Sequence, residues 1–249
     1  MYGTALPTRP ALHAEWIKIR SLRGTVGALT AIFVATAGIQ ALSAAAGTVE
    51  DGSLGDDPLL AAFFGINFGQ IAAMAFGASA FAAEFHNGGL RVSLASVPNR
   101  TRFYLSKAAV VGALALAVGL AAGLASFAAG QALGGASALG WGTSGAGRAI
   151  VGSGLYLMVM ALFAAGLTAV LRSGTLVLGL LIPLVLVVSF VMGGLVGGPA
   201  QYLPDRAGQM VLRSVEHGAL GPWTGLGVSA LWALAALAGG CLAVRRRDA

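Results

Sequence analysis

Charge is scarce in this chain: of its 249 residues only 10% are charged, whereas soluble proteins contain about 25%. Hydrophobic residues make up 57%, and they gather in long runs without Asp, Glu, Lys, Arg or His. A bilayer is crossed by about 20 apolar residues in a helix, and these runs are long enough. The scarcity of charge therefore excludes a water-soluble core and predicts a membrane protein.

Cysteine and metal-binding motifs are also scarce. Cys241 is the single cysteine, so no intramolecular disulfide can form, and there is no HExxH motif or Cys/His cluster. His13, His86 and His217 are scattered over separate polar segments. An intramembrane enzyme needs ionisable groups at depth in the membrane, and the apolar runs carry none, which makes this class the less favoured one.

No nucleotide-binding motif of the form GxxxxGK[ST] occurs, so we expect no cofactor in this chain. A protein of this kind that is driven by ATP needs a separate subunit to bind ATP and Mg. The net charge of +6 would suggest nucleic acid in a soluble protein. Here the basic residues flank the apolar runs, as the positive-inside rule requires of membrane proteins, so we expect no nucleic-acid partner.

Six apolar runs divide the chain into one membrane domain over residues 1–249. The predicted spans are 26–46, 59–83, 108–133, 149–171, 175–195 and 223–244. With both termini in the cytoplasm, 12 of the 15 lysines and arginines lie at the inner ends of the spans. The sequence thus predicts an all-α integral protein with six transmembrane helices in the cell (plasma or inner) membrane.

Two polar segments outside the spans have helical patterns. Apolar residues recur on one face of 11–23, which predicts an N-terminal amphipathic helix on the cytoplasmic surface; a simple basic flank is the alternative. The loop 197–222 is too polar to span, and its pattern predicts one or two short extracellular helices at the membrane surface before the last span.

Glycine is abundant, with 38 residues, and small residues let membrane helices approach closely. GxxxG spacing occurs at Gly65/Gly69, Gly119/Gly123, Gly193/Gly197 and Gly194/Gly198. We interpret most of these pairs as helix contacts. Pro183 lies inside the fifth predicted span, where the loss of a backbone donor should kink the helix.

The polar stretch between the second and third spans is the candidate functional segment. An Asn-Gly-Gly turn at 87–89 can end a helix, since glycine accepts positive φ. Leu90, Leu94 and Val97 then share one face of a short helix that Pro98 ends. Such a helix can lie in a groove of a soluble partner or on anionic headgroups, and its residues alone leave both open.

The same stretch follows the pattern E-x(3)-G-G-L-x(3)-L-x(3)-P-x-R-x(6)-K. The pattern is formed by Glu84, Gly88, Gly89, Leu90, Leu94, Pro98, Arg100 and Lys107. It resembles the first cytoplasmic loop of ABC-2-type permeases, the membrane subunits of ATP-driven exporters. The EWIKIRSLRG segment before the first span, LPDRA in the last outer loop and the RRRDA end are also similar. The resemblance therefore covers essentially the whole chain in layout.

This resemblance implies a permease that dimerises with itself or a relative and pairs with two copies of an ABC ATPase, which bind ATP and Mg. It implies that the 84–107 loop holds a coupling helix seated in the ATPase. The residues expected to make or support that contact are Glu84, Gly89, Leu90, Arg91, Leu94, Val97, Pro98 and Arg100.

In this family the substrate path runs between two membrane domains and is lined largely by the second and fifth spans. Asn67, Gln70 and Met74 share one side of the second predicted span, so the resemblance makes them candidates for a cavity wall. The alternative is that neighbouring helices satisfy the polar side chains of Asn67 and Gln70.

Two rival functions belong to other classes. A non-transporting membrane anchor or immunity component of an ABC complex would keep the coupling loop, and ATP-dependent flux in vesicles would separate it from a permease. An intramembrane enzyme would instead be active without any ATPase partner.

Overall fold

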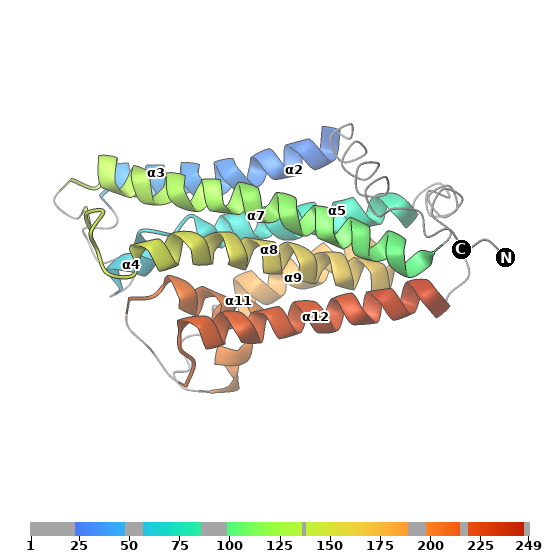
Figure 1. Cartoon of the computed structure of the whole chain (residues 1–249). Coiled ribbons are helices and arrows are strands. Elements are labelled where there is room, and N and C mark those ends of the chain that lie inside the picture. The colour runs from blue at the N-terminus through green and yellow to red at the C-terminus, as the bar shows by residue number, and fades with distance from the viewer. Residues whose placement is uncertain are drawn as a thin grey trace, which may run out of the picture.

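The computed structural model describes residues 23–47, 57–85, 99–135, 138–188, 198–214 and 219–246. Every regular element in these ranges is a helix, and the long helices lie side by side in an elongated bundle (Figure 1). Five of the described helices are long and apolar enough to cross a membrane. The chain is thus an all-α, multi-pass membrane protein, as its composition predicts.

The long helices of the bundle run along one axis in both directions. The first crossing joins α2 (Arg23–Phe33), the π-helical η1 (Val34–Gly38) and α3 (Ile39–Ala45), and the others are α5 (Ile66–Phe85), α7 (Arg100–Leu133), α8 (Ala146–Leu171) and α12 (Pro222–Arg246). Helix α8 packs against α5, α7 and α12, and Tyr156, Leu157 and Met160 on it are fully buried. It is the central helix of the core.

The second predicted span, 59–83, consists of two helices. Helix α4 (Pro58–Ala61) ends after a single turn, and α5 begins at Ile66. Between them Gly65 lies so close to the first crossing that a Cβ there would overlap the carbonyl oxygen of Thr36. The Gly65 N–H donates to Gln40 Oε1 at 3.3 Å. The break therefore lets the chain dock on η1 and α3.

The third crossing begins earlier than predicted, at Arg100 instead of Ala108. The Asn99 side chain caps α7 by accepting a hydrogen bond from the Arg102 N–H at 3.0 Å, and such a cap stabilises a helix by about 1 kcal/mol. Because the helix starts here, Lys107 is a residue of α7. The third crossing thus contains an ionisable side chain that the predicted span excluded.

Helix α9 (Gly174–Pro183) and the π-helical η3 (Leu184–Val188) occupy the fifth predicted span, 175–195. Their described length is shorter than a full crossing, and residues 189–197 lie outside the described ranges. Pro183 stands where α-helix changes to π-helix, as expected of a residue that removes a backbone donor. In Figure 1, α8 and α12 run in the same direction. Helix α9, which comes between them in the sequence, runs in the opposite direction.

Three short helices precede α12: η4 (Pro199–Tyr202), α11 (Pro204–Gln209) and η5 (Met210–Leu212). One or two short helices at the membrane surface were predicted in this loop, and their place relative to the membrane stays a prediction. Helix α11 packs on the end of the bundle, because Gly208 lies against the Tyr156 ring and Gly225 of α12 lies against the Ala207 carbonyl. Apart from Arg23, the predicted N-terminal helix 11–23 falls outside the described residues.

Two of the four predicted GxxxG pairs, Gly65/Gly69 and Gly119/Gly123, are confirmed as helix contacts. A Cβ at Gly69 would overlap the Thr36 hydroxyl, and one at Gly123 would overlap the Ser153 hydroxyl. Gly119 belongs to the same motif as Gly123. A Cβ at Gly119 would lie 3.0 Å from the Gly154 Cα. These glycines bring α5 onto η1 and α7 onto α8. The pairs at 193/197 and 194/198 involve residues outside the described part of the chain.

Candidate functional site

One end of the bundle, here called the basic end, gathers arginines from three helices. Arg100 at the start of α7 donates from Nη1 to the Val244 carbonyl of α12 at 3.3 Å. Arg172 at the end of α8 lies 5.9 Å from the centre of the Phe85 ring at the end of α5. Arg245 and Arg246 occupy the last turn of α12.

The helices on either side of the predicted coupling loop, α5 and α7, have their loop-side ends at the basic end. Glu84 and Arg100 are placed by the structure on α5 and α7. The other predicted contact residues lie outside the described residues, and these are Gly89, Leu90, Arg91, Leu94, Val97 and Pro98. Their part in coupling stays a prediction.

A buried ion pair joins the two helices that flank this loop. Lys107 Nζ donates to Glu84 Oε1 at 2.7 Å, and each side chain is only 3% exposed. Lys107 Nζ also lies 5.8 Å from the centre of the Phe81 ring and 6.0 Å from that of Phe103. Aromatic faces attract cations at these distances, so the ammonium group has favourable neighbours besides the carboxylate.

Tyr104 extends this cluster to a third helix. The centre of its ring lies 5.4 Å from that of Phe81, in an edge-to-face arrangement. Its hydroxyl oxygen lies close to α12, since a Cβ at Gly240 would be only 2.5 Å from it. We call Phe81, Glu84, Phe103, Tyr104 and Lys107 the loop anchor. Loss of one partner from a buried ion pair costs about 3–5 kcal/mol. The loop anchor therefore joins α5, α7 and α12 at the base of the loop.

The opposite end of the bundle holds a network of neutral polar side chains. Tyr156 of α8 donates its hydroxyl to Gln70 Oε1 of α5. Gln209 of α11 donates from Nε2 to Asn67 Oδ1 at 3.2 Å and approaches Gln70 Oε1 at 3.4 Å. This amide network connects three elements that are far apart in the sequence.

The amide network borders a cavity of about 340 Å³ between α5, η3 and α11, here called the polar cavity. Asn67 and Gln70 line it, together with Asp205, Arg206 and Gln209. Met74 does not line it, because its side chain is fully buried in the core. The structure brings two of the three predicted wall residues together at a cavity, and their role in a substrate path stays a prediction.

Asp57 ties together the two loops beside the polar cavity. Its Oδ1 accepts from the N–H groups of Leu59 and Leu60 at 3.1 and 3.2 Å, which caps α4. The same carboxylate accepts from the Ser214 N–H at 2.8 Å and from the Ser214 hydroxyl at 2.7 Å. A buried carboxylate with these donors fixes the start of α4 relative to the segment after η5.

Arg213 lines the same cavity next to other charges. Burial lowers the pKa of its guanidinium, Asp57 acts to raise it, and Arg206 lowers it further by repulsion. Arg148 of α8 donates from Nη2 to the Arg213 carbonyl oxygen. The sequence did not predict that Gln209 or the arginines would line a cavity. The LPDRA segment, which carries Asp205 and Arg206, was noted only for its resemblance to ABC-2-type permeases.

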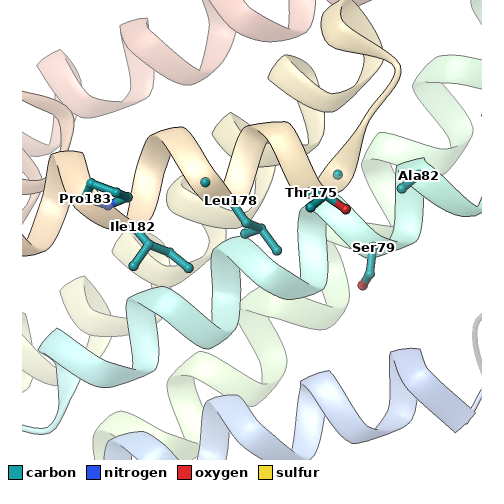
Figure 2. Close-up of a pocket in the computed structure, with 8 residues that line it drawn as sticks. Ser79, Ala82, Thr175, Leu178, Ile182 and Pro183 are labelled. Carbon is teal, nitrogen blue, oxygen red and sulfur yellow. The ribbon is translucent and has the colours of Figure 1, made fainter.

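A second hollow, of about 570 Å³, lies between α5 and α9. Figure 2 shows Ser79 and Ala82 of α5 beside Thr175, Leu178, Ile182 and Pro183 of α9. No ionisable side chain lines it, so it has no acid–base chemistry to offer. Within the ranges that the structure describes, no group of His, Cys, Asp and Glu could hold a metal ion.

Comparison with known proteins does not identify the family of this chain. No protein-family model matches the chain, and no curated protein matches it. Its function is therefore inferred from the loop pattern and from the chemistry of the two ends.

Proposed function

We propose that this chain is the permease subunit of an ABC exporter of the ABC-2 type. In this proposal a separate ATPase contacts the 84–107 loop, and two membrane subunits and two ATPase subunits form the complex. The observation that supports it best is the buried 2.7 Å pair between Glu84 and Lys107 at the base of that loop. A push on the loop would move α5 and α7 together, because separating a buried ion pair costs several kcal/mol.

The proposal includes six crossings with both termini in the cytoplasm. The direction of α9 supports a further crossing, since α8 and α12 are parallel and the chain must return between them (Figure 1). The clustering of Arg100, Arg172 and Arg245 at one end supports a cytoplasmic basic end.

The rival function as a non-transporting anchor shares the loop and the loop anchor. The polar cavity favours the permease, because an anchor has no need of a 340 Å³ cavity whose lining includes amide and charged side chains. Groups of this kind inside membrane proteins usually mark ligand or ion pathways. ATP-dependent flux in vesicles that contain the whole complex would be expected of the permease only.

Gentle purification of the chain from its native membrane tests the ATPase contact. We expect a soluble ATPase to co-purify with the wild-type chain and to be lost from Leu94→Asp, because a charge on the apolar face of the coupling helix removes groove burial. Ser144→Asp, at an exposed position of the opposite end, is the matched control and should retain the ATPase.

Both variants should unfold at the wild-type temperature, which separates lost docking from lost folding. Purification of the wild-type chain without any ATPase, or equal retention of the ATPase by Leu94→Asp, would contradict the proposal. Turnover of a substrate by the isolated chain would favour an intramembrane enzyme instead.

A further inference from the structure

The polar cavity combines two chemically different walls. Phe64, Phe68 and Leu186 form part of the apolar wall, with the two phenylalanine rings edge to face at 5.9 Å. Phe68 is 40% exposed and Leu186 48% exposed, so the apolar wall continues onto the outer surface of the bundle. A hydrocarbon chain could enter there from the surrounding lipid without crossing a polar surface.

The other wall is built from amides and charged groups. Gln209 is oriented by its bonds to Asn67 and Gln70, which makes this part of the wall preorganised. Arg206 and Arg213 both line the cavity, and repulsion by the positive charge of Arg206 contributes to the lowered pKa of Arg213. An anion between them would relieve this repulsion.

Groups of both charge signs lie at or beside this cavity. The charged residues that line the cavity are Arg206, Arg213 and Asp205. Asp57 accepts four hydrogen bonds from backbone and hydroxyl donors, and Asp205 is 2% exposed. Within this lining two guanidinium groups face one carboxylate, which favours an anionic ligand.

From these two walls we infer that the polar cavity binds an amphiphile with an anionic headgroup, such as a phosphate or carboxylate, on a hydrocarbon chain. The headgroup contacts Arg206 and Arg213, and the chain lies along Phe64, Phe68 and Leu186. Guanidinium groups suit this role because they hold phosphate and carboxylate oxygens in charge-assisted, often bidentate, hydrogen bonds. The site goes beyond the proposed coupling function, because binding needs no ATPase.

The test uses the purified full chain in neutral detergent and three probes that share one acyl chain. These are lysophosphatidic acid, lysophosphatidylcholine and monoacylglycerol, and native mass spectrometry measures the bound fraction of each. We expect lysophosphatidic acid to bind about tenfold more tightly than monoacylglycerol, as one or two charge-assisted hydrogen bonds allow. Equal affinity for the three probes would overturn the inference.

Variants locate the site. Arg213→Gln should abolish the preference for lysophosphatidic acid while leaving the backbone carbonyl that Arg148 binds, and Arg206→Gln provides a second, independent test. Arg246→Gln, which removes an exposed arginine at the basic end, is the control and should keep the preference. An unchanged preference in folded Arg206→Gln and Arg213→Gln would place the ligand elsewhere and contradict the inference.

The same spectra distinguish two sources of such a ligand. An anionic phospholipid that is retained by the wild-type chain and lost from Arg213→Gln identifies a resident bilayer lipid. Probe binding without any retained lipid identifies a site for a transported amphiphile. Both results support the anionic site.

Discussion

The loop anchor and the polar cavity lie towards opposite ends of α5, and they use polar groups in different ways. At the basic end, Glu84 and Lys107 form one short ionic contact sealed by aromatic rings. At the other end, Asn67, Gln70 and Gln209 share longer, neutral hydrogen bonds beside a cavity. A sealed pair resists separation, whereas an amide network next to open space can exchange partners with a ligand.

The difference suggests a division of roles along one helix. In the proposed function, the basic end transmits displacement from the loop, and the cavity end holds the inferred ligand. Both ends belong to helix α5, and Gly77 between them lies directly against the backbone of α8. The predictions below test each part of this division, from the largest expected effect to the smallest.

Breaking the ion pair at the basic end should have the largest effect. Glu84→Gln leaves Lys107 charged and buried, and we expect a loss of about 3–5 kcal/mol in unfolding free energy, measured by denaturation in detergent. The double variant Glu84→Leu with Lys107→Met removes both charges and should lie much closer to wild type. Equal stability of Glu84→Gln and the wild-type chain would show that the pair does not hold the loop base.

Filling the contact between α5 and α8 should have the next largest effect. A Cβ at Gly77 would overlap the Ala161 carbonyl oxygen, so Gly77→Ala should destabilise the bundle by about 1–3 kcal/mol, as overpacking does. Gly227→Ala in α12 is the matched control, because nothing lies within 4 Å of its Cβ position. Thermal unfolding of both variants measures the difference, and equal melting temperatures would contradict a tight contact at Gly77.

Weakening the frame of the polar cavity should have a moderate and local effect. Asp57→Ala removes the cap of α4 and the bonds to Ser214, which should cost about 1–2 kcal/mol. Ser214→Ala removes only the hydroxyl bond and should cost about 1 kcal/mol or less. Co-purification of the ATPase should be unchanged in both, and its loss would show that the two ends are not separate in function.

The smallest effect is expected within the amide network. Tyr156→Phe removes the hydroxyl that donates to Gln70, and interhelical hydrogen bonds of this kind contribute about 0.6 kcal/mol in membranes. Stability should therefore change little, whereas the affinity for an anionic amphiphile should fall as Gln70 and Gln209 lose their orientation. A loss of several kcal/mol in unfolding free energy would mean that the network is structural and as rigid as the loop anchor.

Five of the six crossings predicted from hydropathy correspond to described helices long enough to span a membrane, because apolar length is a property of each segment alone. Boundaries were less predictable, since the start of α7 at Arg100 depends on the Asn99 cap and on the burial of Lys107 against Glu84. Glu84 and Lys107 are both part of the loop pattern found in the sequence. Their contact could not be predicted, because it requires α7 to begin before the apolar run at 108–133.

The candidate cavity was partly predictable for a similar reason. Asn67 and Gln70 are conspicuous as polar residues within an apolar run, and both line the polar cavity. Met74 shares their helix side, yet its side chain is in the core, because the packing of α5 decides which turn faces the cavity. Gln209 and Arg213 come from the loop before α12, and no local sequence pattern predicts that this loop packs against the bundle.

The orientation of the two ends is the most direct test of this account. In a Cys241→Ser background, Asn99→Cys reports on the basic end and Ser144→Cys on the opposite end, and both positions are exposed. With a membrane-impermeant maleimide on intact cells, we expect labelling of Ser144→Cys at once and of Asn99→Cys only after permeabilisation. Labelling of Asn99→Cys from outside intact cells would place the loop away from any cytoplasmic ATPase and would contradict the proposed function.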